Sequence, residues 1–193
     1  RLCRDLFIPC KIVRLTIKQK GERGSWENLA REKRYNALVK AARRQKADCI
    51  ALGHHLDDCA ETVLLHLLRG AGLQGLQGIL PSRRIDNVLV IRPLIKISKA
   101  EILQFLKRQK ISFCHDETND ETTFFRNKIR RELLPLLERN YQPGIKNLLA
   151  GLAETAGLDY DFLDDQVEGQ LKKTAYPRRG KRDVKQIILK MVS

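Results

Sequence analysis

The sequence predicts an α/β fold in which a doubly wound parallel sheet is followed by a helical segment. Three observations lead to this prediction. Short apolar or β-branched runs alternate with segments of helical periodicity in the N-terminal half, an order typical of parallel strands joined by helical crossovers. Hydrophobic residues make up 42% of the 193 residues, which is enough for a packed core. Beyond about residue 144 the pattern is helical.

Three runs are predicted to be strands. Residues 9–19, PCKIVRLTIKQ, alternate polar and apolar side chains and are rich in β-branched residues. Residues 48–53, DCIALG, form a short apolar run of the kind found in buried parallel strands. Residues 88–91, VLVI, form another such run. We expect these three segments to form the sheet.

Helices are predicted between and after these strands from capping signals and from the spacing of apolar residues. Ser25 is placed to cap the first helix, and Ser98 with Glu101 forms a capping box for a later one. Pro135 is expected to end or kink the helix that contains it. The predicted helices cover about residues 25–46, 59–69, 98–110, 124–138 and 144–171.

A domain boundary is predicted at NYQPG, residues 140–144, where the apolar pattern is interrupted. We therefore expect a catalytic domain over residues 1–140, and a helical linker with the start of a C-terminal region over residues 141–193. The chain begins at Arg1 rather than Met, so we expect it to be a piece of a longer protein.

The charge balance indicates a polyanionic partner. Lys and Arg total 37 against 23 Asp and Glu, a net charge of +14 at pH 7, and a field of this sign attracts nucleic acid. The basic tail contains two pairs that we expect either to contact RNA or to belong to a solvated linker. These residues are Arg178, Arg179, Lys181 and Arg182. No apolar run is long enough to span a bilayer, so no membrane association is expected.

The five cysteines argue against a disulfide framework. Their number is odd and none forms a C-x-x-C pair, which also makes a cysteine-rich zinc site a poor interpretation. A reducing, cytoplasmic location fits best. Each cysteine is expected to be a small buried side chain.

Chemistry-bearing side chains are concentrated in the run GHHLDDCAET, which starts at Gly53, follows a predicted strand and opens a predicted helix. Ligands of open α/β sheets bind where strands end, and a helix N-terminus there offers free N–H groups. Asp57 or Asp58 could act simply as the helix cap, but capping explains neither the two preceding histidines nor Glu61. A divalent metal site completed by ligands from elsewhere in the chain is a second interpretation.

Three blocks of the sequence carry a specific resemblance, namely GHHLDDCAETVLLHLLRGAGLQGLQGI, WENLAREKRYNAL with its Arg-x-x-Arg-Tyr, and DETNDETTFFRNKIRRELLPLL with its Arg-Asn-x-Ile-Arg-x-x-Leu-Leu-Pro. Together they resemble the tRNA(Ile)-lysidine synthetase family of the PP-loop (N-type) ATP pyrophosphatases. The blocks stand in the family's order and cover about residues 9–140. The resemblance implies a Rossmann-like fold of the PP-loop ATPase type, similar to the adenine nucleotide alpha hydrolases.

Two features depart from the family's pattern. Cys59 stands where Gln is usual. The family's SGGxDS phosphate loop does not occur in this sequence and would belong to a strand upstream of Arg1. Since that loop grips the pyrophosphate, we expect the fragment alone to be inactive.

The resemblance implies a ligase that forms a carbon–nitrogen bond. Such enzymes use ATP and Mg²⁺ to adenylate carbon 2 of the wobble cytidine in tRNA(Ile) with a CAU anticodon. An amine of free L-lysine then displaces AMP, which gives lysidine. The expected partners are therefore tRNA(Ile), ATP and L-lysine, and a homodimer is left open.

The nucleotide half of such a site is assigned to four residues. Asp58 is expected to hold Mg²⁺ on the triphosphate, with Asp57 as its helper or as the helix cap. Arg126 and, second, Arg34 match arginines of the family's motifs and are expected to stabilise charge that develops on phosphate.

The lysine half is assigned to Glu61 and His54. Glu61 is the expected carboxylate for the ammonium group, and His54 is the nearby polar group or proton acceptor. The glycine-rich segment 71–79 is expected to be a flexible loop that becomes ordered when tRNA or ATP binds, or else a plain connector.

Two rival functions stay open at this point. One is tRNA thiolation by the same superfamily, which the absence of C-x-x-C disfavours. The other is a non-catalytic RNA-binding protein, which would fit the net charge of +14 and the missing phosphate loop.

Overall fold

The computed structural model describes residues 2–16, 26–113, 125–176 and 188–189. The chain divides into two compact units. Unit 1 comprises residues 1–52 and 81–92, and unit 2 comprises residues 53–80 and 93–193.

Unit 1 contains a three-stranded sheet of order β1-β3-β2. Strand β1 (Cys49–Ala51) pairs in parallel with β3 (Val88–Ile91), with Ile50 opposite Val90. Strand β2 (Ser82–Ile85) pairs antiparallel with β3. The parallel pair confirms two predicted strands, whereas β2 is missed by the sequence prediction because SRRI shows no apolar alternation.

A tight hairpin joins β2 to β3. Asp86 and Asn87, its two connecting residues, have φ angles of 47° and 64°. A two-residue connection with both residues in the left-handed region matches the right-handed twist of the strands, and Asp and Asn tolerate that region better than most residues. The sheet is therefore mixed, with one parallel and one antiparallel pair.

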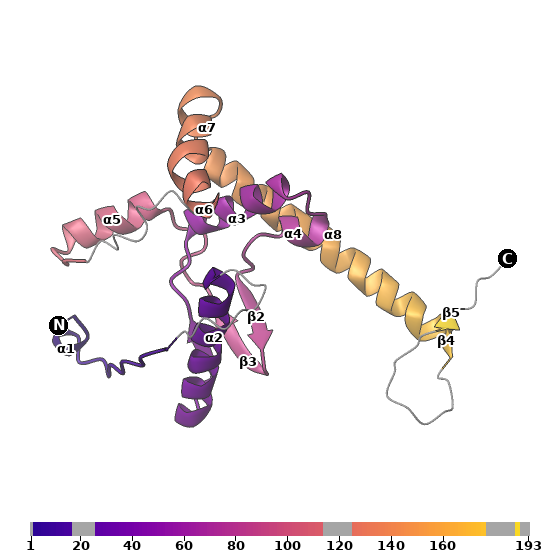
Figure 1. The fold of residues 1–193 in the computed structure, drawn as a ribbon, viewed down its shortest axis with the longest axis horizontal. Coiled ribbons are helices and arrows are strands. Elements are labelled where there is room, and N and C mark those ends of the chain that lie inside the picture. Colours follow the sequence, from indigo (N-terminus) through magenta and orange to yellow (C-terminus); the bar gives the residue numbers. More distant parts are fainter. Residues whose placement is uncertain (1, 17–25, 114–124, 177–187, 190–193) are drawn as a thin grey trace. The chain divides into compact units, whose positions relative to one another are not determined.

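Helix α2 (Trp26–Gln45) covers this sheet (Figure 1). Val39 and Ala42 from the helix pack with Ile50, Val88 and Val90 from the strands, and Val90 is completely buried. The helix begins and ends close to the predicted bounds, although Ser25 lies outside the described residues.

The prediction of a strand over residues 9–19 is wrong for its described part. Helix α1 (Leu2–Asp5) is followed by residues 8–16 without strand pairing. The Nζ of Lys33 on α2 donates a 2.8 Å hydrogen bond to the carbonyl of Thr16. A β-branched alternating run predicts a strand only where a neighbour offers backbone partners, and the described strands of unit 1 pair with one another instead.

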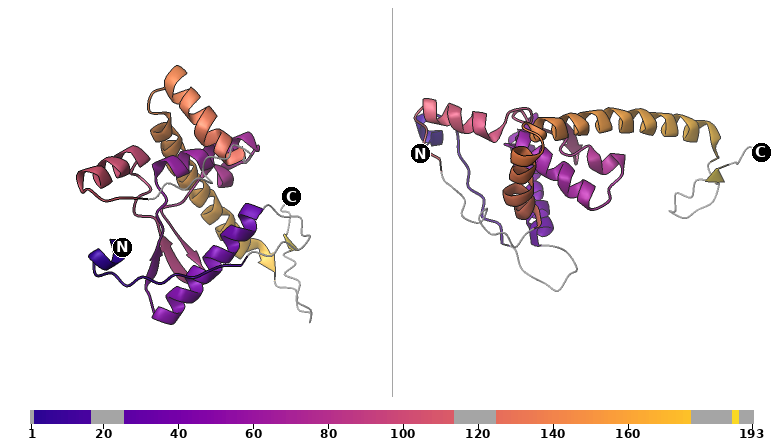
Figure 2. Two further views of the ribbon diagram at one scale, coloured as in Figure 1. Left: turned by 60° about the vertical axis from the view of Figure 1, so that its left-hand side comes forward. Right: turned by 90° about the horizontal axis from the view of Figure 1, so that it is seen from above.

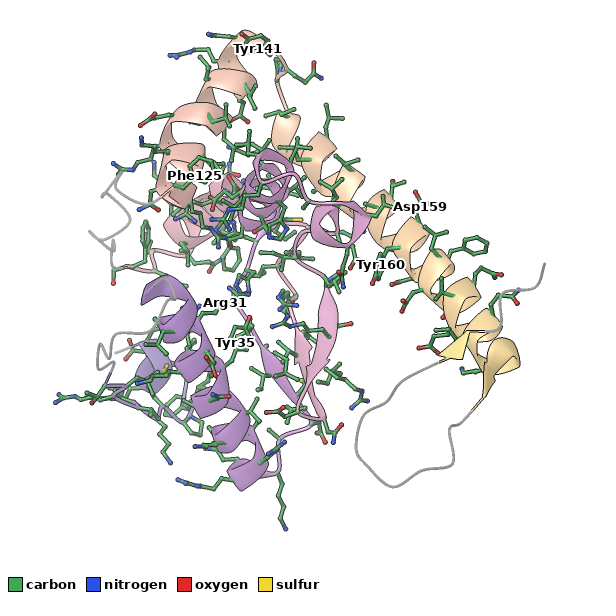
Figure 3. The ribbon with its side chains drawn as sticks, turned by 45° about the vertical axis from the view of Figure 1, so that its right-hand side comes forward. Arg31, Tyr35, Phe125, Tyr141, Asp159 and Tyr160 are labelled. Atoms are coloured by element: carbon green, nitrogen blue, oxygen red, sulfur yellow. The ribbon has the colours of Figure 1, made fainter. Side chains whose placement is uncertain are left out.

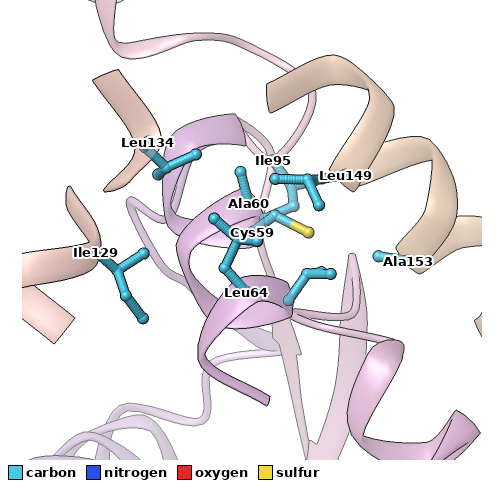
Figure 4. Packing of buried hydrophobic residues seen from close by; sticks show 9 residues of the cluster. Cys59, Ala60, Leu64, Ile95, Ile129, Leu134, Leu149 and Ala153 are labelled. Atoms are coloured by element: carbon cyan, nitrogen blue, oxygen red, sulfur yellow. The ribbon is translucent and has the colours of Figure 1, made fainter. Parts of the chain in front are cut away.

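Unit 2 is built around helix α3 (Leu56–Leu68) and the long helix α8 (Ile145–Thr174), with α3 and the short α4 (Leu73–Leu76) lying along the N-terminal half of α8 (Figure 2). Buried side chains of α3 face α8 on one side and the α6–α7 segment on the other (Figure 4). The shared core consists of Cys59, Ala60, Val63, Leu64, Ile95, Ile129, Leu134, Leu149 and Ala153.

Pro135 distorts the helix that contains it, as predicted. The helix runs as α6 (Phe125–Lys128), a π-helical turn η2 (Ile129–Leu133) and α7 (Leu134–Asn140). Proline has no N–H to donate and its ring crowds the carbonyl four residues earlier, so the wider π-helical turn precedes it. A turn follows α7 and leads into α8, and the predicted domain division at 140–144 stays a prediction.

Helix α5 (Lys99–Arg108) confirms the predicted capping box. The amide of Glu101 donates to the hydroxyl of Ser98 at 3.2 Å, and a Glu101 carboxylate oxygen accepts from the amide of Ser98 at 2.8 Å. Two short strands, β4 (Ala175–Tyr176) and β5 (Ile188–Leu189), pair antiparallel near the C-terminus. None of the described helices is long and apolar enough to cross a membrane.

The expectation of a flexible loop over residues 71–79 is wrong for its centre. Helix α4 forms there, and Nδ1 of His66 on α3 lies 2.5 Å from the carbonyl oxygen of Gly75. Gly78 has a φ of 61° and lies so close to α3 that a Cβ atom would come within 3.0 Å of Val63 and 3.2 Å of Cys59. Ordering on ligand binding stays a prediction.

Candidate functional site

Helix α3 begins at Leu56, about one turn earlier than predicted. The acidic run therefore lies in its first turn. His55 is the N-cap residue, and its amide donates a 3.0 Å hydrogen bond to Oδ2 of Asp58. The interpretation of Asp57 or Asp58 as the N-cap is therefore wrong, because Asp58 caps from the third helical position instead. The amide of Leu56 donates to the carbonyl of Ile97 at 2.9 Å, which fixes the start of the helix.

Glu61 is the most deeply buried charged group at this helix start, with 2% of its surface exposed. Two guanidinium groups hold it. Arg130 donates from Nε to Oε1 at 2.6 Å and from Nη2 to Oε2 at 2.9 Å, whereas Arg126 donates from Nε to Oε2 at 3.3 Å. The bidentate pair with Arg130 is thus the tighter of the two.

Asp58 lies one helical turn before Glu61, on the same face of α3, and completes this group. Its Oδ1 lies 3.4 Å from Nη2 of Arg130 and 3.9 Å from Nη2 of Arg126. The hydrogen bonds that Arg130 donates to Glu61 raise the pKa of Arg130, although the partial burial of Arg130 acts in the opposite direction. We call these four residues, Asp58, Glu61, Arg126 and Arg130, the carboxylate–arginine cluster.

Asp57 points to a different set of partners. Its Oδ2 accepts a 2.7 Å hydrogen bond from the amide of Lys99, and its Oδ1 lies 3.3 Å from Nζ of Lys146. Lys146 also bridges to Glu138 at 2.9 Å. Burial by itself raises the pKa of Asp57, but the Lys99 amide and the Lys146 ammonium outweigh it and hold that pKa below its usual value. Asp57 therefore links α3 to α5, α7 and α8.

The two histidines precede the helix. The ring of His55 lies 3.7 Å from Asp57 and 3.5 Å from Asp58. His54 is half-buried, and its proposed role as a proton acceptor stays a prediction.

The structure brings together four of the residues singled out in the sequence: Asp57, Asp58, Glu61 and Arg126. Arg34 is exposed on α2 in unit 1, so its place in the site stays a prediction. Four predicted RNA contacts lie outside the described residues, namely Arg178, Arg179, Lys181 and Arg182.

Two residues of the site are missed by sequence reasoning. Arg130 is the second arginine of the Arg-Asn-x-Ile-Arg motif and stands four positions after Arg126, so both lie on one helical face. The motif and this spacing are the signals that could have found it. Lys146 follows the predicted boundary by two residues, and no local pattern relates it to Asp57. Its contact is created only by the packing of α8 against α3.

Magnesium fits this site as a shared ion rather than as one in a protein cage. Among the described residues, no group of three or more His, Cys, Asp and Glu side chains is arranged to hold a metal. Asp58 supplies hard carboxylate oxygens, and Mg²⁺ commonly uses one or two carboxylates together with substrate phosphates and water. Such an ion would be held on the protein side by Asp58 and would supply positive charge for a phosphate-bearing ligand.

A polar cluster at a helix start that follows a parallel strand in the chain is typical of α/β proteins that bind phosphate-bearing ligands. Comparison with known proteins identifies the family within this class. The chain belongs to the PP-loop domain family, whose model matches residues 1–137.

Curated relatives match most of the chain. A tRNA(Ile)-lysidine synthase from Clostridium perfringens is 35% identical over 174 residues, which is 89% of this chain and 36% of the relative. Another from Symbiobacterium thermophilum is 37% identical over 183 residues, 94% of this chain and 37% of the relative. The chain therefore spans little more than a third of these relatives.

A solved structure supports the fold. The U34-tRNA thiolase NcsA from Methanococcus maripaludis with its 4Fe–4S cluster superimposes with a TM-score of 0.65 at 24% identity. The match covers 80% of this chain and 53% of that chain. The predicted PP-loop α/β fold is confirmed.

Proposed function

We propose that the whole protein to which this chain belongs is a tRNA(Ile)-lysidine synthase that acts on tRNA(Ile), ATP and L-lysine. One observation supports this most strongly. The carboxylate–arginine cluster is built from two motif blocks, and both lie in the part of the chain that is 35–37% identical to relatives of that name. A cytoplasmic location and a homodimer belong to the same proposal.

The first chemical step is adenylation. The O2 atom of the wobble cytidine attacks the α-phosphorus of ATP, and pyrophosphate leaves. Negative charge that develops on the phosphate needs fixed donors in a partly dry site. Arg126, which holds Glu61 through one 3.3 Å hydrogen bond, is the guanidinium that turns to the phosphate, while Arg130 stays bound to Glu61. Asp58 would hold Mg²⁺, and the ion would supply positive charge against the triphosphate.

The second step forms the carbon–nitrogen bond. An amine of lysine attacks carbon 2 of the adenylated cytidine, the bond from carbon 2 to oxygen breaks, and AMP leaves. The amine must lose a proton, and His54 is the proposed acceptor. Glu61 binds the ammonium group in this proposal, which requires Arg126 to release Oε2 of Glu61 first. Phosphate binding and lysine binding are thereby coupled through one guanidinium.

Thiolation is the second candidate. The structural neighbour is a thiolase that carries an iron–sulfur cluster. This chain has five cysteines without a C-x-x-C pair, and thiolate ligands would be needed for such a cluster. Lysidine formation is therefore the better supported of the two reactions.

The test uses the full-length protein. It is incubated with ATP, lysine and unmodified tRNA(Ile), and lysidine is measured by mass spectrometry. We expect lysidine with the wild type and with the exposed-site control Glu154→Gln, and at least a ~100-fold lower rate with Arg126→Ala. No lysidine with the wild type, or undiminished lysidine with Arg126→Ala, would refute the proposal.

A further inference from the structure

Positive charge is concentrated in one unit of the molecule. Unit 1 contains 17 Lys and Arg against 6 Asp and Glu, a net charge of +11. Unit 2 contains the remaining 20 against 17, a net charge of +3. A polyanion is therefore drawn to unit 1, although the carboxylate–arginine cluster belongs to unit 2.

Three arginines of unit 1 gather around Tyr35. The guanidinium carbon of Arg31 lies 5.1 Å from the ring centroid of Tyr35, and its Nη2 donates to the phenol oxygen at 3.4 Å. The guanidinium carbon of Arg83, from β2, lies 5.3 Å from the same centroid. Arg92, directly after β3, donates a hydrogen bond to the Tyr35 hydroxyl. Arg31 and Tyr35 lie on the side of α2 that faces the strands (Figure 3).

The aromatic ring orders the guanidinium groups. Both distances lie within the range of about 6 Å over which a cation and a ring attract each other. An arginine held in this way loses less side-chain freedom when it binds a ligand. Burial raises the pKa of Tyr35, but Arg92 and Arg31 outweigh it and the pKa lies below its usual value. In its protonated form the phenol carries no charge, unlike the carboxylates that face the arginines of unit 2.

Tyr35 and the three arginines around it differ in how much of their surface solvent can reach. Arg92 and Tyr35 are 3% and 7% exposed, Arg31 is half-buried, and Arg83 is exposed. A ligand from solvent therefore meets Arg83 and Arg31, while the buried pair supports them. Planar guanidinium groups match the oxygens of a phosphate in a bidentate manner.

We propose that Arg31 and Arg83, ordered over Tyr35, form a binding site for a phosphodiester group of the RNA substrate. The inference rests on the proposed function, because that function supplies the RNA. A phosphate of ATP would offer the same oxygens, so the experiment measures both ligands.

The test compares Arg83→Gln with Arg44→Gln in the full-length protein. Arg44 is also exposed and lies in unit 1, but it lines a groove with residues 11–16 on the other face of α2. The dissociation constants for unmodified tRNA(Ile) are measured over a series of salt concentrations. We expect Arg83→Gln to weaken tRNA binding about 3- to 10-fold near 0.1 M salt. The slope of log affinity against log salt concentration (the salt slope) should fall by the amount that corresponds to about one phosphate contact. Arg44→Gln should stay within about twofold of the wild type.

Two results would overturn the site. One is equal tRNA affinity and salt slope in the two variants. The other is weaker binding of ATP, with unchanged tRNA binding, in Arg83→Gln. Lysidine formation by the wild type is scored separately. An Arg83-dependent tRNA affinity without any lysidine would support the phosphate site and reject the proposed function.

Discussion

The two arginine clusters of this molecule differ in what lies opposite the guanidinium groups. In unit 2, Arg126 and Arg130 meet the carboxylates of Glu61 and Asp58. In unit 1, the arginines surround the neutral phenol of Tyr35. The same side chain thus forms ion pairs with carboxylates in unit 2 and lies over an aromatic ring in unit 1.

This difference separates two tasks. A guanidinium paired with a buried carboxylate has a fixed starting orientation, from which it can turn to a developing negative charge, as the proposed adenylation would require. A guanidinium over an aromatic ring is ordered by that ring, which suits the capture of a polyanion in a unit whose net charge is +11. The comparison predicts that removal of a carboxylate charge beside Arg126 or Arg130 has a large effect on the free energy of unfolding. Removal of a charge beside Tyr35 should have a small one.

The largest effect is expected from Glu61→Gln. It leaves two partly buried guanidinium groups with a neutral amide, and the loss of one partner of a buried ion pair is strongly destabilising. We expect a loss of about 2–4 kcal/mol in the free energy of unfolding, measured by urea denaturation. Glu154→Gln, which breaks an exposed pair with Lys96, should cost at most about 1 kcal/mol. Equal losses in both variants would mean that the Glu61 network does not stabilise unit 2.

An intermediate effect is expected from Asp57→Asn. The pKa of Asp57 is lower in the folded protein than in the unfolded chain, so its stabilisation is present above the unfolded pKa and disappears as the pH falls through the folded one. Asp57→Asn should therefore cost about 1 kcal/mol at pH 7, and the difference from wild type should vanish well below pH 4 or so. A difference that is constant from pH 7 to pH 3 or so would contradict the assigned ion pair. The exposed Asp159, labelled in Figure 3, offers Asp159→Asn as the control.

The smallest effect is expected at Tyr35. Because its pKa is lowered in the folded state, stability from its ionisation appears only at alkaline pH and contributes nothing near pH 7. Ultraviolet titration of the wild type minus that of Tyr35→Phe should show a phenol that ionises below the usual pKa of about 10. Arg31→Gln should move this step upward. A step at or above the usual value would show that the arginines do not act on Tyr35.

Much of the fold follows from local signals in the sequence. Helix α5 has its capping box at Ser98 and Glu101, and the strands β1 and β3 are short apolar runs. Such features depend on neighbours in the chain. Strand β2 depends instead on pairing with β3, and its two adjacent arginines remove the apolar alternation from which a strand is predicted. Residues 9–16 show the converse, because an alternating run forms no ladder without a backbone partner.

Site residues that belong to a motif could be predicted from the sequence. Site residues that are brought together only by helix packing could not. Asp58 and Glu61 stand out as acidic residues at a strand-to-helix turn, and Arg126 stands out as an arginine of the motif that resembles the family. Arg130 is the second arginine of the Arg-Asn-x-Ile-Arg motif and stands one helical turn after Arg126, whereas Lys146 is brought to the site only by the packing of α8 on α3. The ion pairs between Glu61 and residues 65 and 69 positions away are properties of the tertiary structure.

The central claim is that the carboxylate–arginine cluster serves adenylyl transfer, and it is tested most directly without lysine. Full-length protein is incubated with tRNA(Ile) and ATP labelled at the α-phosphate, and the label on the tRNA is measured over time. We expect label on tRNA with the wild type and with the exposed control Arg108→Ala, and almost none with Arg126→Ala. Equal labelling by Arg126→Ala and Arg108→Ala would contradict the claim.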